Sequence, residues 1–506
     1  MNETIKEHSW IPLIGVALAS FIIALDSTFM NVTISQLVVD LNTDVSTIQL
    51  TMSFYTLITA AFMLLCAKLQ DIVGKKKLFL IGTALYGVGT LIAAVSTSAL
   101  MLFIGWSAIE GVAGALMLPA TVSIVSGTYS GERRTIGLAI VSVMGAIASA
   151  VGPLFGGVMT TFLSWRHGFA CELIVVIIIL VLQNKIPDFA PTESKSDLDV
   201  TGAVISFIGL VVLVLGILSL SDDMATSIAV IILGLIVLAA FALFELRRKR
   251  KGEVPLLDVE LFKDRNLRVG TTIQLLCYLI MAGGLFAVSV YLQSVLELNA
   301  FDTGLATLPL TMGLLIFSMI APELSEKLSH KKLMAIGSIM SIIGCLILSY
   351  QFRLVMSPWE LLPGMFILGA GFGFIMALSV DIALIDIPDE SQNNASGITS
   401  TGQSLGESMG TAIIGIILIL GVFGGISHTV DVYAPQYSGN ETFQMDVFND
   451  FEKMGMNDVK ENSNFEIIAD IIIQEAMGFV MIVTAILMAV VFVLTLRLKD
   501  MKIEKR

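Results

Sequence analysis

The chain has 506 residues, of which 56% are hydrophobic and only 14% are charged, and its mean hydropathy is +0.88. An ordinary soluble domain carries about 25% charged residues, so these charges are too few to cover a soluble globular surface. The net charge of −13 argues against a nucleic-acid binder, which needs a basic face. Four cysteines exclude a disulfide scaffold. The composition therefore predicts a polytopic membrane protein.

Fourteen apolar stretches are long enough to cross a bilayer, which takes roughly 20 residues in a helix. Transmembrane barrels instead show strands of about 10 residues with alternating polarity, so we predict an all-α membrane protein. The first stretch contains Asp26 and no clear cleavage site, and we expect it to be the first span rather than a signal peptide. The predicted spans lie near 11–34, 46–68, 77–97, 100–128, 135–160, 167–186, 200–220, 225–246, 269–293, 303–324, 332–351, 358–385, 397–422 and 467–496.

The distribution of basic residues supports this count. If the N-terminus is cytoplasmic and the spans alternate, all but four of the 29 Lys and Arg residues fall in cytoplasmic segments. The four exceptions are Arg166, Arg353, Lys453 and Lys460. The partition predicts a multi-pass protein of the cell membrane with both termini in the cytoplasm. It also leaves no basic side chain in the interior of the membrane.

An internal repeat predicts two homologous halves. The loop at 67–82, after the second span, aligns with the loop at 322–337, after the tenth, at a constant offset of 255 residues. Parallel repeats occur in secondary transporters, where the substrate binds between the halves. We therefore expect an N-terminal six-helix bundle at 1–186 and a C-terminal six-helix bundle at 269–506.

The region between the bundles, 187–268, is expected to be a linker with two inserted transmembrane helices and a cytoplasmic amphipathic segment. Its basic run at 247–251 is expected to contact anionic lipid. Within the second bundle, the acidic stretch at 424–466 is predicted to be an extracellular loop that binds no calcium, because its carboxylates do not have the spacing of a calcium loop.

Three motifs mark transporter-like segments. They are LDSTFMNVTIS at 25–35 in the first span, AKLQDIVGKKK at 67–77 after the second, and GAIASAVGPLFGG at 145–157 in the fifth. On these residues the chain resembles the major facilitator superfamily, in its fourteen-helix drug:proton antiporter branch. The resemblance implies the major facilitator fold and proton-coupled multidrug efflux by alternating access. Its expected partners are small lipophilic substrates, protons and the lipid bilayer.

The chain departs from the family pattern at charged positions inside the spans. Ser107 stands where the resemblance implies an Arg that assists proton exchange, and Glu110 stands where Gln is usual. Glu172 replaces a common Asn, while Gln403 and Glu407 stand where the family often has Arg and Gly. The chain has therefore lost buried basic residues and gained buried acidic ones.

Four carboxylates lie well inside predicted spans without a basic partner: Asp26, Glu110, Glu172 and Glu407. A charged group at this depth costs roughly 2.5–3.5 kcal/mol on insertion scales, so each must be protonated, reach water or meet a cation. Groups that change between these states can couple transport to protons. We expect Asp26 to be the principal proton-coupling or substrate-cation residue, followed by Glu110 and Glu407. Glu172 lies nearer the outer surface, where simple hydration is the alternative.

The turn after the second span is a candidate gating motif, formed by Asp71, Gly74, Lys75 and Lys76. Gly74 permits positive φ or a close backbone approach. Asp71 is expected to accept amide N–H groups of a helix N-terminus across the bundle interface, a contact that would break when the halves rock. The alternative is a plain cluster of charges that fixes membrane topology.

The fifth span carries the candidate antiporter motif. Gly145, Gly152 and Gly156 follow helical spacing, with Gly157 beside them, and small residues at such positions let two helices approach closely. Pro153 is expected to bend the helix. A close helix contact beside this bend would favour one state of the transport cycle. Ordinary packing of small residues is the alternative.

A cavity with acids and without bases favours cationic or neutral compounds. Aromatic and methionine side chains such as Met30, Tyr55 and Trp106 are available to line an adaptable pocket, although ordinary packing is the more common role of such residues. The first hypothesis is a proton-driven exporter of lipophilic, cationic compounds. The second is a carrier of another substrate, such as a lipid, peptide or metabolite, on the same fold.

A third hypothesis, a membrane enzyme or receptor, is disfavoured by the sequence, which contains no phosphate-binding loop and no HExxH or paired Cys/His spacing. We expect a monomer with no catalytic residue, no metal and no cofactor.

Overall fold

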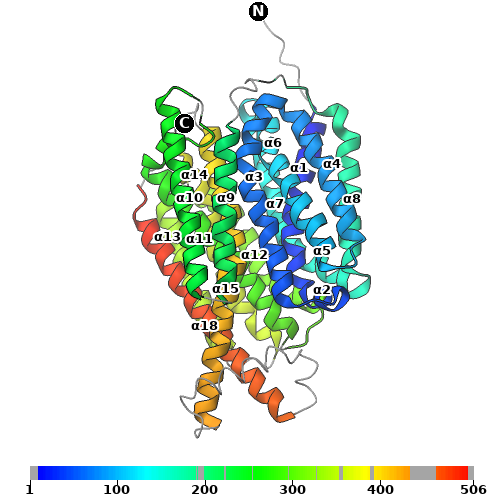
Figure 1. Cartoon of the computed structure of the whole chain (residues 1–506), viewed down its shortest axis with the longest axis vertical. Coiled ribbons are helices and arrows are strands. Elements are labelled where there is room, and N and C mark those ends of the chain that lie inside the picture. Colours follow the sequence, from blue (N-terminus) through cyan, green and yellow to red (C-terminus); the bar gives the residue numbers. More distant parts are fainter. Residues whose placement is uncertain are drawn as a thin grey trace, which may run out of the picture.

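The computed structural model describes residues 9–189, 191, 199–221, 224–253, 255–294, 296–325, 327–352, 357–387, 392–433 and 463–499. Within these ranges the chain is helical and contains no strand. Fourteen helices are long and apolar enough to cross a membrane, as the sequence predicted. They run roughly parallel to one axis of the molecule (Figure 1).

The N-terminal bundle contains six of these spans. It is built from α1 (Ile11–Phe29), α2 (Ile34–Leu41), α3 (Val45–Val73), α4 (Lys75–Ala94), α5 (Ala99–Leu102), α6 (Gly111–Thr128), α7 (Gly131–Phe162) and α8 (Trp165–Val181). A π-helical segment, Phe103–Glu110, joins α5 and α6 into the fourth span. The short α2 caps one end of the bundle, which we call the α2 end (Figure 1).

The second half of the chain forms the inserted pair and the C-terminal bundle. The inserted helices are α9 (Val200–Leu218) and α10 (Met224–Arg250), and the bundle contains α11 (Arg265–Ser294), α12 (Ala300–Ser325), α13 (His330–Gln351), α14 (Leu362–Leu384), α15 (Gln392–Tyr433) and α18 (Ser463–Leu496). The helix pairs that pack in this bundle repeat those of the first: α13 packs on α14 and α18 as α4 packs on α6 and α8.

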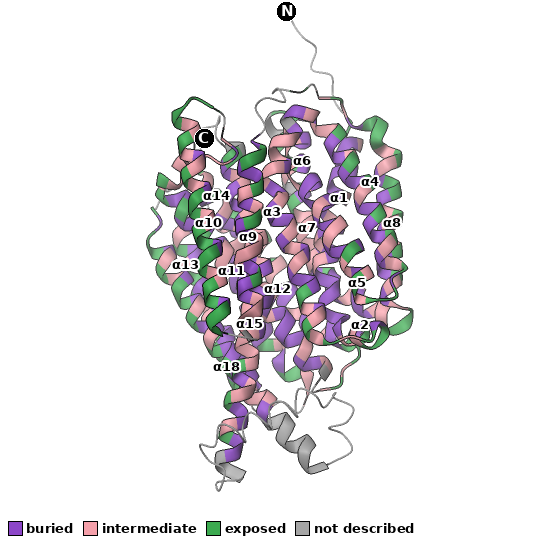
Figure 2. Cartoon of the chain, in the orientation of Figure 1, coloured by how far each residue is buried: buried purple, intermediate pink, exposed green. Residues whose placement is uncertain are grey.

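Each bundle buries its own apolar core, while apolar side chains also remain on the outside (Figure 2). The inserted α10 is the clearest case, because Ile232, Leu235 and Ile236 are each more than half exposed. Such an apolar outer surface is the one that lipid covers in a membrane protein. The inserted pair therefore presents α10 outward.

The other inserted helix, α9, lies against the seam between the bundles. Leu210 and Val214 of α9 are buried in one cluster with Leu57 of α3, and Leu405 of α15 packs against it. Because α3 belongs to the first bundle and α15 to the second, α9 contacts both halves.

Two helices extend further than the sequence predicted. The thirteenth span was expected to end near residue 422, but α15 continues to Tyr433, and α18 begins at Ser463. The two helices pack on each other there, with Gly425 of α15 against Ile472 of α18, and Ile426 and Val430 are buried. This mutual burial favours helix over loop. Of the predicted loop at 424–466, residues 434–462 lie outside the described part of the chain.

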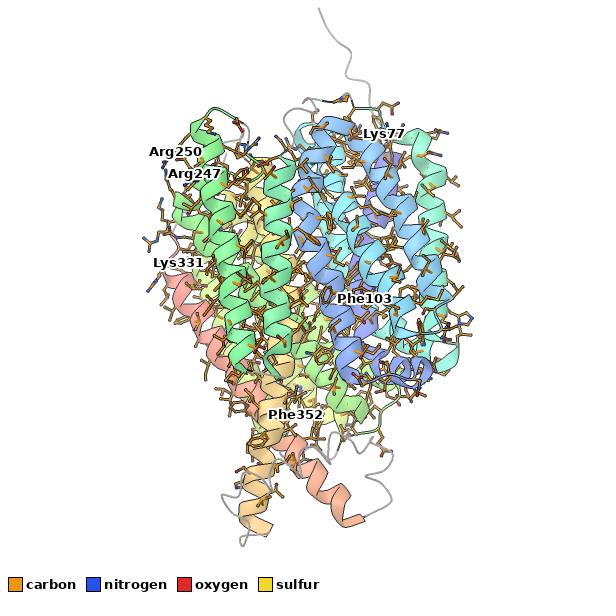
Figure 3. All side chains as sticks on the ribbon, in the orientation of Figure 1. Lys77, Phe103, Arg247, Arg250, Lys331 and Phe352 are labelled. Carbon is orange, nitrogen blue, oxygen red and sulfur yellow. The ribbon has the colours of Figure 1, made fainter. Side chains whose placement is uncertain are left out.

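The linker after α10 pairs with its own basic run. Lys249 forms ion pairs with Asp258 at 2.7 Å and with Glu260 at 2.8 Å, and Arg248 contacts Asp199 at 3.2 Å. These two basic residues are therefore held by acidic groups of the chain, and the expected contact of the basic run with anionic lipid stays a prediction. Figure 3 shows Arg247 and Arg250 projecting from the same helix end.

The expected amphipathic segment is reduced to a single 3₁₀ turn, Val259–Lys263. Leu261 and Phe262 of this turn pack against Leu267 and Ala383 of the C-terminal bundle. Glu245 of α10 fixes the start of the segment, since its Oε2 accepts a hydrogen bond from the Leu256 amide at 2.8 Å. The linker thus joins α10 to the C-terminal bundle at the end opposite α2.

One face of the fifth-span motif lies on α1, as close packing of small residues requires. Gly152 contacts Thr28, and a Cβ on Gly156 would stand 2.6 Å from the Phe29 carbonyl oxygen. Gly145 does not share this role, because a Cβ there would meet nothing within 4 Å. The close contact therefore covers only part of the predicted motif.

The other face of the motif crosses the seam. A Cβ on Gly157 would stand 2.5 Å from the Ala300 carbonyl oxygen of α12, and one on Gly304 would stand 2.5 Å from the carbonyl oxygen of Pro153. The backbones of α7 and α12 therefore touch at this point. Pro153 lies inside the continuous helix α7.

Hydrogen bonds also join the bundles toward the α2 end. Gln293 of α11 accepts from the Ser35 amide at 3.1 Å and donates to the Asn31 carbonyl at 3.3 Å. Between α3 and α15, the hydroxyls of Ser53 and Thr411 are 2.6 Å apart. These hydrogen bonds hold the two halves together at this end.

Two glycines of α7 provide a matched pair for testing the seam. Gly157→Ala should destabilise the protein by about 1–3 kcal/mol, because the new methyl group overpacks the contact with α12. Gly145→Ala should be neutral or stabilise by up to roughly 1 kcal/mol, because it improves helix propensity in open space. Thermal unfolding of the purified protein in detergent measures both. Equal effects of the two changes would contradict the packing shown here.

The linker contact should depend on acid pH. Lys249 and Lys263 lower the pKa of Glu260 to about 2, compared with about 4.3 for a free Glu. A lowered pKa gives a contribution that is complete above about pH 5 and is lost as the pH falls through about 2. Amide hydrogen exchange across 255–264 should therefore accelerate in that window, and Lys249→Gln should accelerate it at pH 7. Unchanged exchange in the variant would contradict the contact.

Candidate proton and substrate site

Three acidic side chains meet inside the N-terminal bundle. Asp26 comes from α1, Glu110 from the end of the π-helical segment and Glu172 from α8, and they are 0%, 0% and 1% exposed. One carboxylate oxygen of each lies within 4.8 Å of the other two. We call these three residues the acidic trio. The alternative of simple hydration for Glu172 does not fit this structure, because helix packing encloses the side chain.

The fourth span shapes this site by an irregular backbone. A π-helical segment widens the turn and is frequent at functional sites. Here it ends at Glu110 and also carries Trp106, and both side chains are buried. Gly89 of α4 makes room for Glu110, since a Cβ at Gly89 would stand 2.5 Å from its Cγ.

The trio receives little hydrogen bonding. The Trp106 indole N–H donates to Asp26 Oδ2 at 2.7 Å. Among the described residues, Asp26 Oδ1 and all four carboxylate oxygens of Glu110 and Glu172 are buried without a hydrogen-bond partner. Buried polar atoms without partners are rare and need an explanation.

Two tyrosines complete the surroundings. Tyr55 of α3 stacks on Trp106 with ring centroids 5.2 Å apart, and Tyr86 of α4 is fully buried. The hydroxyl groups of both lie in electrostatic reach of all three acids. Neither hydroxyl has a described partner at ordinary hydrogen-bond distance and angle. Of the residues that the structure describes, no Lys, Arg or His is among the main groups acting on the trio.

This arrangement cannot hold three negative charges. Ionised carboxylates at such short range repel each other, and burial removes the water that would screen them. Positive charge must therefore be supplied, and proton binding supplies it without adding atoms to a closed site. Ser107 stands where the resemblance implies an Arg, and a serine provides no positive charge. Its hydroxyl donates to the Thr51 carbonyl at 2.7 Å.

Glu407 lies apart from the trio, in the C-terminal bundle on α15. It is only partly buried, and Tyr278 of α11 lies within its electrostatic reach. One turn earlier Gln403 donates to Gln274 at 3.0 Å. Its neighbour Ser408 donates across the seam to the Ser53 carbonyl at 2.8 Å. The four predicted acids thus occupy two places, one inside a bundle and one beside the seam.

The candidate gating motif meets the linker. Gly74 adopts φ +100°, as its position in the turn predicted. Lys76 pairs with Asp188 at 3.0 Å, and the Lys75 amine lies 5.7 Å from the centre of the Phe189 ring. The side chain of Asp71 lies outside the described part of the structure, so its expected contact across the interface stays a prediction.

The sequence missed the groups that face the trio. Tyr55 and Trp106 were candidates for an apolar pocket, but they bring a hydroxyl and an indole N–H to buried acids. Tyr86 was not singled out, because no motif or periodicity marks it. Only the tertiary contact of α1, α3, α4 and the fourth span reveals this role.

Comparison with known proteins places the chain in a family. The family model described as Major Facilitator Superfamily matches residues 16–411. A solved structure of a bacterial homolog of the human lysosomal transporter Spinster superposes with a TM-score of 0.64 at 12% identity, covering 96% of this chain and 97% of that one. This likeness concerns the fold.

Two relatives align over most of their length. The chain is 26% identical over 413 residues to the multidrug efflux pump LfrA of Mycolicibacterium smegmatis, covering 81% of each protein. It is 30% identical over 397 residues to the quinolone resistance protein NorB of Staphylococcus aureus, covering 78% of this chain and 83% of that protein. The chain therefore belongs to the Major Facilitator Superfamily, as its motifs predicted, and is a multi-pass membrane transporter.

Proposed function

We propose that this transporter exports lipophilic, cationic compounds across the cell membrane in exchange for protons, by alternating access. The observation that carries the proposal is the acidic trio, which is buried in a transporter fold without any base among its main neighbours. Asp26 is the principal proton acceptor, because it lies in the first-span motif and already receives the Trp106 N–H.

The substrate class rests on two supports. The relatives are named for multidrug efflux and quinolone resistance. Glu407 lies beside the seam and is only partly buried, so it is more accessible to an organic cation than the enclosed trio is. In this proposal protons occupy the trio, while Glu407 attracts the positive charge of the substrate.

The topology follows from the basic residues. Figure 3 shows Lys77, Arg247 and Arg250 at the end of the molecule opposite α2. Because positive charge favours the cytoplasmic side, that end and both chain termini are assigned to the cytoplasm. The hydrogen bonds near the α2 end then close the outer side of the seam. The transporter is proposed to act as a monomer.

The two motifs would serve the conformational cycle. Gly152, Pro153, Gly156 and Gly157 join α7 to both α1 and α12, so this contact would set which side of the seam is closed. Gly74, Lys75 and Lys76 hold the linker against the N-terminal bundle. Release of these contacts would accompany rocking of the two halves.

Replacing the proton acceptor should abolish coupled export. Asp26→Asn keeps the size of the side chain and its acceptor for Trp106, but it can neither gain nor lose a proton. Efflux of ethidium driven by a pH gradient in proteoliposomes should fall at least tenfold, and a protonophore should abolish wild-type efflux. Undiminished efflux by Asp26→Asn would remove Asp26 from the mechanism.

Neutralising Glu407 should change substrate preference. Glu407→Gln removes the negative charge at the seam, so transport of a lipophilic cation should weaken by about tenfold, the equivalent of roughly 1.4 kcal/mol. Transport of a neutral compound of similar size should change much less. A panel of charged and neutral fluorescent compounds separates these results. If no lipophilic cation is transported by the wild-type protein, a carrier of another substrate becomes the better proposal.

A further inference from the structure

Within the described residues, the acidic trio has no counterpart cluster of acids in the other half of this internally repeated molecule. The offset of 255 residues that aligns the two loops also relates Asp26 to Met281 and Glu110 to Met365. Helix α18 packs on α13 as α8, which carries Glu172, packs on α4. The C-terminal bundle therefore shows what the same fold contains without acids.

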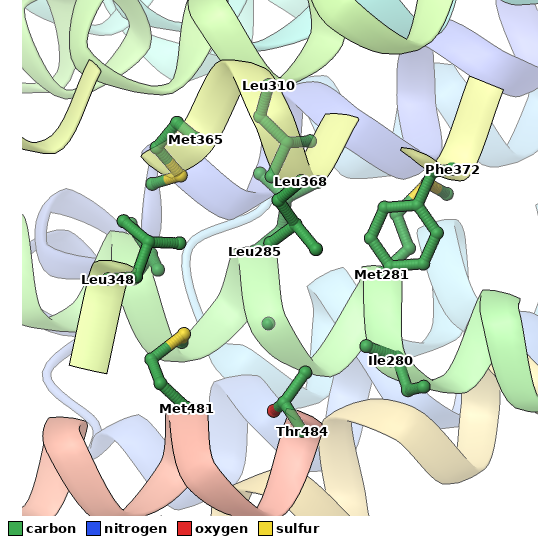
Figure 4. A pocket seen from close by; sticks show the side chains of 12 residues that line it. Ile280, Met281, Leu285, Leu310, Leu348, Met365, Leu368, Phe372, Met481 and Thr484 are labelled. Carbon is green, nitrogen blue, oxygen red and sulfur yellow. The ribbon is translucent and has the colours of Figure 1, made fainter. Parts of the chain in front are cut away.

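At that place the C-terminal bundle holds an apolar pocket. Met281, Met365 and Met481 line it, from α11, α14 and α18. Leu310 occupies the position related to Tyr55 by the same offset. Figure 4 shows these side chains converging with Leu285 and Phe372. Methionines thus stand at the two positions that the offset relates to Asp26 and Glu110, and a third, Met481, lies on the helix that corresponds by its packing to the one carrying Glu172.

This comparison separates packing from function. The C-terminal bundle encloses its pocket with apolar side chains alone, apart from Thr484, whose hydroxyl donates to the Val480 carbonyl. The architecture therefore does not require a polar group here. Burying a polar group without a partner is unfavourable, so the acids of the N-terminal bundle must serve a ligand that neutralises them.

The three acids are not equivalent. Asp26 has a donor in Trp106, which can stabilise a negative charge. Glu110 and Glu172 have no hydrogen-bond partner on either oxygen within the described chain. The ionisable groups that act on the pair are Asp26, Tyr55 and Tyr86, together with Cys171 beside Glu172. Each of these groups is neutral when protonated and negatively charged when deprotonated. None can therefore neutralise an ionised Glu.

The tyrosine hydroxyls also indicate that the ligand of the acids is a proton. Tyr55 and Tyr86 are 3% and 0% exposed, and their hydroxyls are unpartnered beside the carboxyl groups. A hydroxyl can accept a hydrogen bond from a protonated carboxyl or donate one to an ionised carboxylate. Such groups serve both states of an acid that gains and loses a proton.

We propose that Glu110 and Glu172 each bind one exchangeable proton, in addition to the proton that Asp26 accepts, so that each transport cycle moves three protons. Each carboxylate gains one proton when the site faces the outer water and releases it toward the cytoplasm. The inference rests on the proposed proton-coupled export and specifies how many protons the site carries and on which residues.

The number of protons moved per substrate is the test. In proteoliposomes, the membrane potential that stops ethidium flux at a fixed pH gradient gives this ratio. The wild-type ratio should be three, one proton for each acid of the trio, and Glu110→Gln and Glu172→Gln should each lower it to two. Glu323→Gln, which makes the same change on the exposed part of α12, should leave the ratio unaltered. An unchanged ratio in both trio variants would overturn the inference.

A second pair of variants separates a loss of proton binding from a loss of folding. Glu110→Met and Glu172→Met place in the N-terminal bundle the residue type found in the C-terminal pocket, so thermal stability should be kept or raised while the ratio falls. Loss of stability in these two variants together with an unchanged ratio in the Gln variants would assign the acids a structural role.

Two further outcomes distinguish the possible failures. Saturable binding of Mg²⁺, Ca²⁺ or Mn²⁺ to the purified wild-type protein, lost in both Gln variants, would overturn the inference because a metal ion would then neutralise the trio. Absence of any proton flux in the wild-type protein would instead overturn the proposed function. Proton flux with a ratio of one, unaffected by the Glu variants, would leave proton-coupled export intact and reject only the additional protons.

Discussion

Three carboxyl groups in one dry site form the strongest physical constraint on this structure. Asp26, Glu110 and Glu172 have no basic residue among their main neighbours, and the bundle excludes water from them. Their charge state must therefore follow the access of protons to the site. In the proposed function, opening and closing of the bundle are linked to proton binding, because the energy of the closed site depends on how many protons it holds.

The site is close to the contact between the two halves. Asp26 lies within one helical turn of Thr28 and Phe29, on which Gly152 and Gly156 of α7 pack. The same helix, α7, touches α12 through Gly157. A change at Asp26 therefore has only a short, closely packed route to the seam. Glu407 lies beside that seam on the opposite bundle. In the proposed function, protons on the trio and the positive charge of a substrate at Glu407 would therefore act on the same contact between the bundles from two separate sites.

The sequence predicted more of the fold than of the site. Long apolar runs require helices in a bilayer, and the basic residues fix their order across it, so all fourteen spans were predictable. The lack of a base near Asp26 was also readable, because every Lys and Arg falls at or beyond the ends of the predicted spans rather than in their interior. The helical extension to Tyr433 was not, since it depends on burial of Ile426 and Val430 against α18. The pairing of Lys249 with Asp258 likewise depends on how the linker folds back.

Composition, span count, the repeat and the presence of lone acids in the membrane were determined by the amino-acid sequence itself, because each follows from local hydropathy and spacing. Only the tertiary structure decided which acids meet. Asp26, Glu110 and Glu172 are joined by the packing of α1, the fourth span and α8, whereas Glu407 is held away on α15. Residues far apart along the chain come together only when many side chains pack against one another. The spacing of residues along the chain does not show which of them will meet.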